Sequence, residues 1–341
     1  MKIAAYAVPD QARLLGADAR RTPEMEALWQ WIVADDASDS DTGRDLDPQQ
    51  ARAMFARLAK RWNIDLPGMA SVERLSLPGL AGAPPIAADM IVPHQARAGC
   101  ILYAHGGGWA FGDLDTHQRT MRMLAQATQT RVLGIDYRLA PEHPYPAPLE
   151  DVLAGWRWLV AESAKDAGKA AGLAGPLAIA GDSAGASLAI SAIMRENELQ
   201  RPIPQTALLF YGIYSADLDS PSYQRFATGH GLTREAMQRF FDWYVPGSTP
   251  DSPRFDTNVN QVVAGEAVLA RLPPLFLNAA GLDVLLCDTL AFAERLRRVG
   301  VMHELVVHEG VHHGFVQYSA RLEEARRAFA LAGDFYRRVV G

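Results

Sequence analysis

One serine of the chain lies in a pentapeptide flanked by glycines, Gly181-Asp182-Ser183-Ala184-Gly185. An apolar run at 177–180 precedes it and a helical pattern at 184–194 follows it. A serine on a sharp strand-to-helix turn exposes its hydroxyl beside the first N–H groups of the helix, where negative charge is favoured. Glycines on both sides leave room for that turn. The pattern therefore indicates a nucleophile at Ser183, with Asp182 supporting the turn.

A second glycine-rich string stands upstream, His105-Gly106-Gly107-Gly108, directly after the apolar run 100–104. Glycines let the backbone turn sharply and bring N–H groups close to a ligand. Such donors, when they point at a developing oxyanion, stabilise it by about 3–4 kcal/mol each. No Lys-Ser or Lys-Thr pair follows and the spacing is not G-x-G-x-x-G, which excludes a phosphate-binding loop. We interpret His105 as an anchor of this loop and not as a proton-transfer group.

A serine nucleophile needs a base, and the base needs an acid that orients it. Five histidines follow Ser183 in the chain: His230, His303, His308, His312 and His313. The last two stand in a loop that follows a strand-like run at 304–307, and strand-end loops carry the catalytic groups of open parallel sheets. These considerations leave His312 and His313 open.

The acid is expected at Asp283, in the loop after the apolar run 275–279, whereas Asp288 falls inside the following helix and is the weaker choice. A metal site made of His308, His312 and His313 is disfavoured, because no carboxylate or cysteine pattern accompanies them.

The elements that must position these groups alternate between strands and helices. Such alternation predicts an α/β fold with a mostly parallel sheet covered by helices on both faces. The predicted strands lie at 72–77, 86–92, 100–104, 131–136, 177–180, 207–211, 275–279 and 305–307, and the helices between and after them at 121–127, 149–160, 184–194, 290–299 and 322–340.

Two stretches stand outside this alternation. The first 70 residues show amphipathic helical patterns with cap signals at Thr22-Pro23 and Asp47-Pro48, separated by an acidic run at 35–41 that we predict to be a loop. About 60 residues without a clear strand separate the apolar runs at 207–211 and 275–279, which is more than a parallel crossover needs. We predict that this insertion, helical at 235–244, packs with the N-terminal helices.

The composition of the chain excludes several classes of function. The 341 residues carry a net charge of 33 − 39 = −6, and 49% of them are hydrophobic. This charge offers no basic field for nucleic acid or an anionic membrane surface. Cys100 and Cys287 are too few for a disulfide framework and are expected to be free thiols. No apolar run predicts a signal peptide or a membrane span, so we expect a cytoplasmic protein.

Four motifs in order resemble the hormone-sensitive-lipase-like carboxylesterases, bacterial family IV of the α/β-hydrolase fold. They are HGGGW at 105–109, DYRLAPEHPYPA at 136–147, GDSAG at 181–185 and HGF at 313–315. The resemblance implies Ser183 as nucleophile, Asp283 as acid and His313, of the two candidates, as base. It also implies an oxyanion hole made by the N–H groups of Gly107, Gly108 and Ala184, with Gly106 shaping the turn. Val284 replaces the proline that often follows the acid in this family.

The same resemblance implies a helical cap in two pieces, 1–70 and 214–265, over a catalytic domain formed by 71–213 and 266–341. It implies no cofactor. Within the DYRLAPEHPYPA segment we expect an internal ion pair between Arg138 and Glu142. Aromatic residues near the motifs are candidates for the substrate pocket: Trp109, Tyr211, Tyr214 and Phe315, with Phe240, Phe241 and Trp243 also considered.

The expected function is hydrolysis of small-molecule esters with short to medium acyl chains, without nucleic-acid or membrane partners. Relatives often form dimers, and a homodimer is an open expectation. An arylformamidase-like amidase is an alternative, because HGGGW also fits a His-Gly-Gly-x-Trp pattern. A catalytically dead small-molecule receptor is a second alternative, disfavoured because receptors of this family lack the base. An Asp-nucleophile hydrolase is disfavoured by Ser183.

Overall fold

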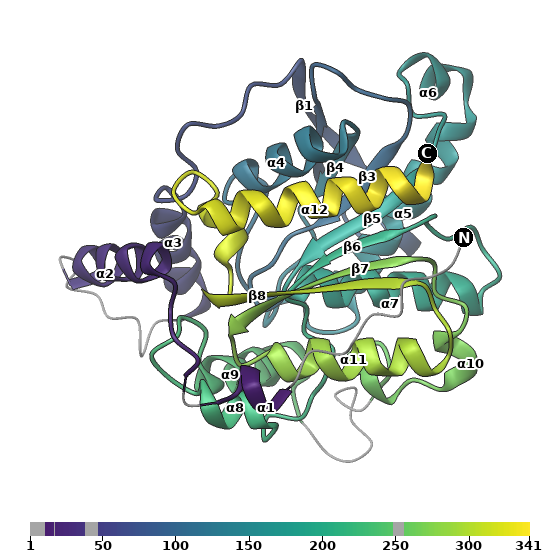
Figure 1. Ribbon diagram of the computed structural model, residues 1–341. Coiled ribbons are helices and arrows are strands. Elements are labelled where there is room, and N and C mark those ends of the chain that lie inside the picture. The colour runs from purple at the N-terminus through teal and green to yellow at the C-terminus, as the bar shows by residue number, and fades with distance from the viewer. Residues whose placement is uncertain (1–10, 17, 38–46, 248–255) are drawn as a thin grey trace.

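The structure, a computed structural model, describes residues 11–16, 18–37, 47–247 and 256–341 (Figure 1). Its centre is an eight-stranded sheet with the strand order β1-β2-β4-β3-β5-β6-β7-β8. Only β2 runs antiparallel to its neighbours β1 and β4, and all other pairs are parallel. The strands are β1 (Ser71–Leu77), β2 (Ile86–Val92), β3 (Cys100–Ala104), β4 (Arg131–Ile135), β5 (Leu177–Asp182), β6 (Ala207–Phe210), β7 (Leu275–Leu282) and β8 (His303–His312). The predicted α/β architecture is confirmed.

The central strands form where the sequence is continuously apolar. Every residue of β3, β6 and β7 is buried. Strands of a parallel sheet are covered on both faces, so they do not alternate between apolar and polar residues. The edge strand β1 differs, because most of its side chains are exposed.

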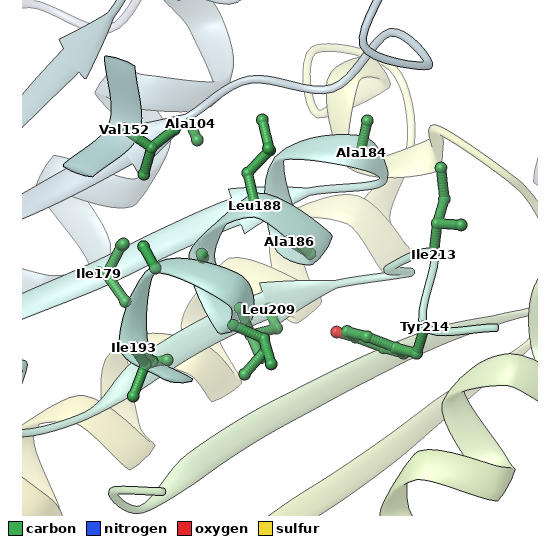
Figure 2. Close-up of a cluster of buried hydrophobic side chains, with 14 of the residues drawn as sticks. Ala104, Val152, Ile179, Ala184, Ala186, Leu188, Ile193, Leu209, Ile213 and Tyr214 are labelled. Atoms are coloured by element: carbon green, nitrogen blue, oxygen red, sulfur yellow. The ribbon is translucent and has the colours of Figure 1, made fainter. Parts of the chain in front are cut away.

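Helices cover both faces of the sheet. On one face α4 (Gln118–Thr128) packs against α12 (Glu323–Val340), and on the other lie α5 (Ala147–Ala164), α7 (Ala184–Glu198) and α11 (Leu286–Arg298) (Figure 1). Two hydrophobic cores result, one on each face. Figure 2 shows the core around α7, where Leu188 and Ile193 lie among side chains of β5 and β6.

The N-terminal helices and the insertion gather at the carboxyl end of the parallel strands (Figure 1). They are α1 (Gln11–Leu14), α2 (Pro23–Ala37), α3 (Pro48–Ala59), α8 (Pro221–Arg225) and α9 (Arg234–Tyr244), while the short α6 (Asp166–Ala170) and α10 (Glu266–Leu269) lie elsewhere. Both predicted cap signals are confirmed. Asp47 forms a capping box with Gln50, and the Thr22 hydroxyl accepts a hydrogen bond from the Met25 N–H.

Two predicted element boundaries need correction. The strand predicted at 305–307 extends from His303 to His312, so His308 lies within it and His312 ends it. The helix α2 continues to Ala37, through the first part of the predicted acidic loop, and the remainder of that loop lies outside the described residues.

The predicted Arg138–Glu142 ion pair is wrong. Arg138 instead forms a bidentate pair with the buried Asp151 on α5, and Glu142 pairs with Arg52 of α3. Arg52 also donates hydrogen bonds to the carbonyl groups of Ala110 and Ala140, which joins α3 to the loops after β3 and β4.

Both cysteines are free and buried. Over the described ranges, no helix is both long enough and apolar enough to cross a membrane.

Candidate active site

Ser183 occupies a strained backbone position between β5 and α7. Its φ of 53° and ψ of −119° are rare for a residue with a side chain. The Ser183 N–H is held by the Phe210 carbonyl at 2.8 Å. A Cβ at Gly181 would lie 2.4 Å from the Gly185 carbonyl carbon, and one at Gly185 would lie 2.0 Å from the Ala104 carbonyl oxygen. Both glycines of the pentapeptide are therefore required by close packing, as the sequence predicted.

Three side chains meet at this turn. His313 Nε2 lies 2.9 Å from Ser183 Oγ, and His313 Nδ1 lies 2.7 Å from Asp283 Oδ2. The residues follow β5, β7 and β8 directly, and the carboxyl ends of these parallel strands lie at the same edge of the sheet. An ionised carboxylate only accepts hydrogen bonds, so Nδ1 carries the proton and Nε2 is free to accept the Ser183 hydroxyl. The other oxygen of Asp283 accepts from the Leu285 N–H at 3.0 Å, which fixes the carboxylate.

Asp182 connects the turn to the glycine-rich loop. Its Oδ1 accepts hydrogen bonds from the Gly106 N–H at 2.8 Å and from the Tyr103 hydroxyl at 2.5 Å. The Tyr211 hydroxyl donates to Oδ2 at 3.4 Å. A Cβ at Gly106 would lie 2.4 Å from the Asp182 carboxylate, so only glycine fits. Because its N–H is already bonded, Gly106 shapes the loop and has no donor left for a ligand.

The next two glycines leave their N–H groups available. Gly107 and Gly108 have φ values of 120° and 60°, which favour glycine. The Gly107 carbonyl accepts hydrogen bonds from the N–H groups of Ala110 and Phe111. Among the described residues, no acceptor is bonded to the N–H groups of Gly107, Gly108 and Ala184. The loop and the helix start thus present backbone donors near the Ser183 turn.

His105 is buried at the base of the loop. Its Nδ1 lies 2.8 Å from the Gly106 carbonyl oxygen, and its ring stacks on Tyr137 with the centroids 4.2 Å apart. Burial, together with the nearby His117, lowers the pKa of His105 to about 3. A histidine that stays neutral over the physiological range suits an anchoring role.

All four pocket candidates are buried, and two of them pack in the hydrophobic core of the α7 and α11 face. The Trp109 ring is fully buried and stacks on Tyr244 with the centroids 4.3 Å apart. The Tyr214 ring is also fully buried, stacks on Phe292 of α11, and belongs to the core drawn in Figure 2. Both residues fill the hydrophobic core on the α7 and α11 face. An aromatic side chain is as suited to packing in a core as to contact with a ligand, so its position near a motif does not place it in the pocket.

Tyr211 and Phe315 lie beside the candidate base. The Tyr211 ring centroid is 4.7 Å from that of His313, and the Phe315 centroid is 5.8 Å from that of Tyr211. Tyr211 has a φ of 37°, which is unusual for a bulky residue. Both side chains are buried, with Tyr211 against the His313 ring and Phe315 packed against Tyr211.

Four half-buried aromatic residues lie at the glycine-rich loop instead: Phe55 of α3, Phe111, and Phe240 and Trp243 of α9. We call them the aromatic cluster. Phe111 contacts Phe55, Phe240 and Trp243, with ring centroids 5.3 to 5.9 Å apart. A Cβ at Gly108 would lie 2.4 Å from the Phe240 ring, so this ring is packed directly on Gly108. Phe240 and Trp243 were pocket candidates from the sequence, whereas Phe55 and Phe111 were not, although Phe111 stands only three residues after Gly108.

The remaining candidate groups have other partners. His308 Nδ1 bonds Glu324 of α12, and His312 accepts a hydrogen bond from Arg21. Asp288 lies in α11, where burial raises its pKa well above the usual range, and its carboxylate accepts from the Ser215 N–H. Within the described ranges, no three His, Cys, Asp or Glu side chains are grouped to hold a metal ion.

A protein family described as having the alpha/beta hydrolase fold matches residues 101–317. The chain belongs to this family. The match includes the glycine-rich loop, the Ser183 turn, Asp283 and His313.

Named relatives agree with this assignment. Carboxylesterase NlhH of Mycobacterium tuberculosis is 39% identical over 231 residues, which cover 67% of this chain and 70% of the relative. Ethyl acetate hydrolase of Pseudomonas putida is 34% identical over 66% of this chain and 68% of its own. The solved structure of an esterase from Pyrobaculum calidifontis superposes with a TM-score of 0.81 at 28% identity, over 94% of this chain and all of that one. The resemblance to carboxylesterases of the α/β-hydrolase fold is thereby confirmed.

Proposed function

We propose that this carboxylic ester hydrolase works through a Ser183-His313-Asp283 triad and an acyl-enzyme intermediate. The observation that carries the proposal is the unbroken chain of hydrogen bonds from Ser183 Oγ through both ring nitrogens of His313 to Asp283. A serine hydroxyl is a weak nucleophile until an adjacent base removes its proton. His313 is placed to do so, and Asp283 holds the tautomer that makes it possible.

In the first half of the reaction, Ser183 Oγ attacks the ester carbonyl carbon while its proton passes to His313 Nε2. The carbonyl oxygen becomes an oxyanion, which accepts hydrogen bonds from the N–H groups of Gly107, Gly108 and Ala184. The intermediate collapses, the bond to the alcohol oxygen breaks, and the alcohol leaves with the proton from His313. Ser183 is then esterified by the acyl group.

In the second half, a water molecule gives a proton to His313 Nε2 and attacks the acyl carbon. A second tetrahedral intermediate forms in the same backbone site. When it collapses, Ser183 takes back its proton from His313 and the carboxylic acid is released. Asp283 stabilises the imidazolium in both halves and stays ionised.

The aromatic cluster supports a preference for short to medium acyl chains. Phe240 is packed on Gly108, so a chain that extends past the carbonyl group meets this ring or the neighbouring Trp243. The Pseudomonas putida relative is named an ethyl acetate hydrolase, whose substrate has a short chain.

A labelling experiment and a substrate series test the proposal. We expect a fluorophosphonate probe to label Ser183 in the folded protein and p-nitrophenyl acetate or butyrate to be hydrolysed faster than longer esters. Ser183→Ala is expected to lose both labelling and turnover, with kcat lower by about 10⁶-fold. Labelling at a different residue would refute the triad. Faster turnover of formanilide than of acetate esters would instead support an amidase, and best activity on long-chain emulsions would refute the chain-length preference.

A further inference from the structure

The chain before α2 is held against the end of β8, next to the proposed base. The Thr22 N–H donates to the Gly310 carbonyl at 3.1 Å. Gly310 has a φ of 74°, and a Cβ there would lie 2.8 Å from the Thr22 nitrogen and 2.9 Å from the Arg20 carbonyl oxygen. The approach is so close that only glycine fits. The 20–22 segment is therefore docked on the strand that ends in His312 and leads into His313.

The guanidinium group of Arg21 connects three parts of the chain at this point. Its Nε donates to His312 Nε2 at 2.7 Å, one Nη donates to Glu26 of α2 at 3.0 Å, and the other donates to the Gly229 carbonyl in the insertion. The α2 and α8–α9 regions both lie at the arrowhead end of β8 in Figure 1. The side chain of Arg21 is only 19% exposed, so water competes little for these bonds.

The His312 ring is held by three neighbouring side chains. Arginine is always protonated and only donates, so Nε2 of His312 must be the acceptor and the ring must be neutral. Burial and the nearby Arg21 lower the pKa of His312 to about 3, which agrees with this tautomer. Trp29 of α2 meets the same ring edge to face at 4.8 Å. The His230 ring of the insertion also meets it edge to face at 5.4 Å, and these three contacts fix the neutral ring at the end of β8.

We infer that Arg21 is a positioning residue for the proposed reaction, acting on His313 through His312. The two histidines are consecutive, and consecutive side chains at a strand end point in different directions. His312 can therefore be held by Arg21 while His313 faces Ser183. The hydrogen bond from Arg21 to the Gly229 carbonyl joins this contact to the insertion. This inference rests on the proposed function, because its consequence is the alignment of His313 with Ser183 and Asp283.

Arg21→Ala and His312→Ala, alone and combined, test the inference. Small misalignments of a catalytic group reduce turnover by up to about 100-fold, and we expect each single variant to lower kcat on p-nitrophenyl acetate by about 10- to 100-fold with little change in KM. Because both residues act through one hydrogen bond, the double variant should be no slower than the slower single variant. Arg21→Lys keeps the positive charge but loses the planar guanidinium group with its several N–H donors. This variant should therefore have a kcat between that of Arg21→Ala and that of the wild type.

Arg13→Ala is the matched control. Arg13 also connects the N-terminal segment to β8, by a pair with Glu309 at 2.6 Å, but both side chains are more than half exposed. This variant should keep the wild-type kcat, with thermal unfolding monitored for all variants. An unchanged kcat in Arg21→Ala, a rise in KM alone, or additive losses in the double variant would each overturn the inference in favour of a cap-ordering or purely structural role. If Arg21→Ala does not fold, Arg21→Lys and His312→Ala carry the same comparison.

A spectroscopic readout separates this inference from the proposed function. The proton shared between His313 Nδ1 and Asp283 should give a far-downfield proton resonance in the wild type and in Arg13→Ala, and this resonance should shift or broaden in Arg21→Ala. An identical resonance in Arg21→Ala would contradict the inference even if no ester were hydrolysed. Absence of phosphonate labelling in the wild type would instead count against the triad.

Discussion

The two sides of the candidate site are built by different means. On the sheet side, Ser183, Asp283 and His313 each follow a parallel strand directly and bond one another at 2.7 and 2.9 Å. On the helical side, Phe55, Phe240 and Trp243 reach the site from α3 and α9 and remain half-buried. The first set is held by backbone register, and the second by contacts between rings.

This difference indicates that separate parts of the site govern the reaction and the choice of substrate. Neighbouring strands fix the reacting groups through many buried hydrogen bonds, so a change there disturbs geometry that the whole sheet maintains. A ring of the aromatic cluster can be replaced while the strands stay in place. We therefore expect mutations on the sheet side to affect turnover and mutations on the helical side to affect which ester is preferred.

After Ser183→Ala, the largest effect should come from Asp283→Asn. An amide in place of this carboxylate no longer favours the Nδ1–H tautomer of His313, and the equivalent change in a serine protease lowers kcat by about 10⁴-fold. Steady-state hydrolysis of p-nitrophenyl acetate measures the loss.

Asp288→Asn is the matched control for Asp283→Asn. Asp288 is equally buried and only five residues away, but its carboxylate accepts a hydrogen bond from the Ser215 N–H, whereas that of Asp283 bonds His313. Its pKa lies well above the usual range, so an uncharged amide resembles its protonated form and kcat should stay near wild type. Similar losses in both variants would show that burial, and not the role in the triad, explains the effect.

The sheet side was predictable because its signals are local. An apolar run followed by a glycine-flanked serine specifies a strand, a turn and a helix within a dozen residues, and the structure has β5 and α7 there. The residues alone left His312 and His313 open. Only the HGF motif favoured His313, and the geometry brings His313, not His312, to Ser183.

The helical side was not predictable in this way, since its contacts join distant segments. Glu142, which was expected to pair with Arg138, pairs with Arg52 of α3, ninety residues before it. Among the aromatic residues near the motifs, the sequence does not say which way a ring points. Trp109 and Tyr214 are fully buried, whereas Phe111 is half-buried beside the rings of Phe240 and Trp243.

Phe240→Ala should have an intermediate effect and test the helical side directly. Removing the ring opens space next to Gly108, so kcat/KM should rise for hexanoate or octanoate esters and fall for acetate. A change of one methylene in a pocket is worth about tenfold, and the ratio of octanoate to acetate turnover should change by at least that factor. A p-nitrophenyl ester series from acetate to decanoate measures it.

Phe241→Ala serves as the control for Phe240→Ala. Phe241 is the next residue of α9, but its ring is fully buried against Trp109. Its removal should destabilise the fold by about 3–5 kcal/mol without changing the preferred chain length. If both variants shift the chain-length preference alike, general loosening of α9 explains the result and the aromatic cluster does not select the substrate.

The smallest effect is expected at the ion pair between the two sides, Arg52–Glu142. Arg52 Nη1 lies 2.9 Å from Glu142 Oε1, but the Glu142 side chain is 43% exposed, so after screening by water the pair contributes less than about 1 kcal/mol.

The hydrogen bond from Arg52 lowers the pKa of Glu142 below its ordinary value. A lowered carboxyl pKa stabilises the fold above that ordinary value, and the contribution is lost as the pH falls through the folded-state pKa. Glu142→Gln should therefore lower the Tm by about 1–2 °C at pH 7, and this difference should shrink as the pH falls through the folded-state pKa of Glu142. Asp151→Asn removes the buried carboxylate that accepts the bidentate bonds of Arg138 and leaves the half-exposed Glu150 as the acidic partner of this arginine, so it should cost more stability at pH 7 than Glu142→Gln. Equal decreases in Tm for the two variants would mean that the ion pair between α3 and the loop after β4 stabilises the fold as much as the pair between Arg138 and α5.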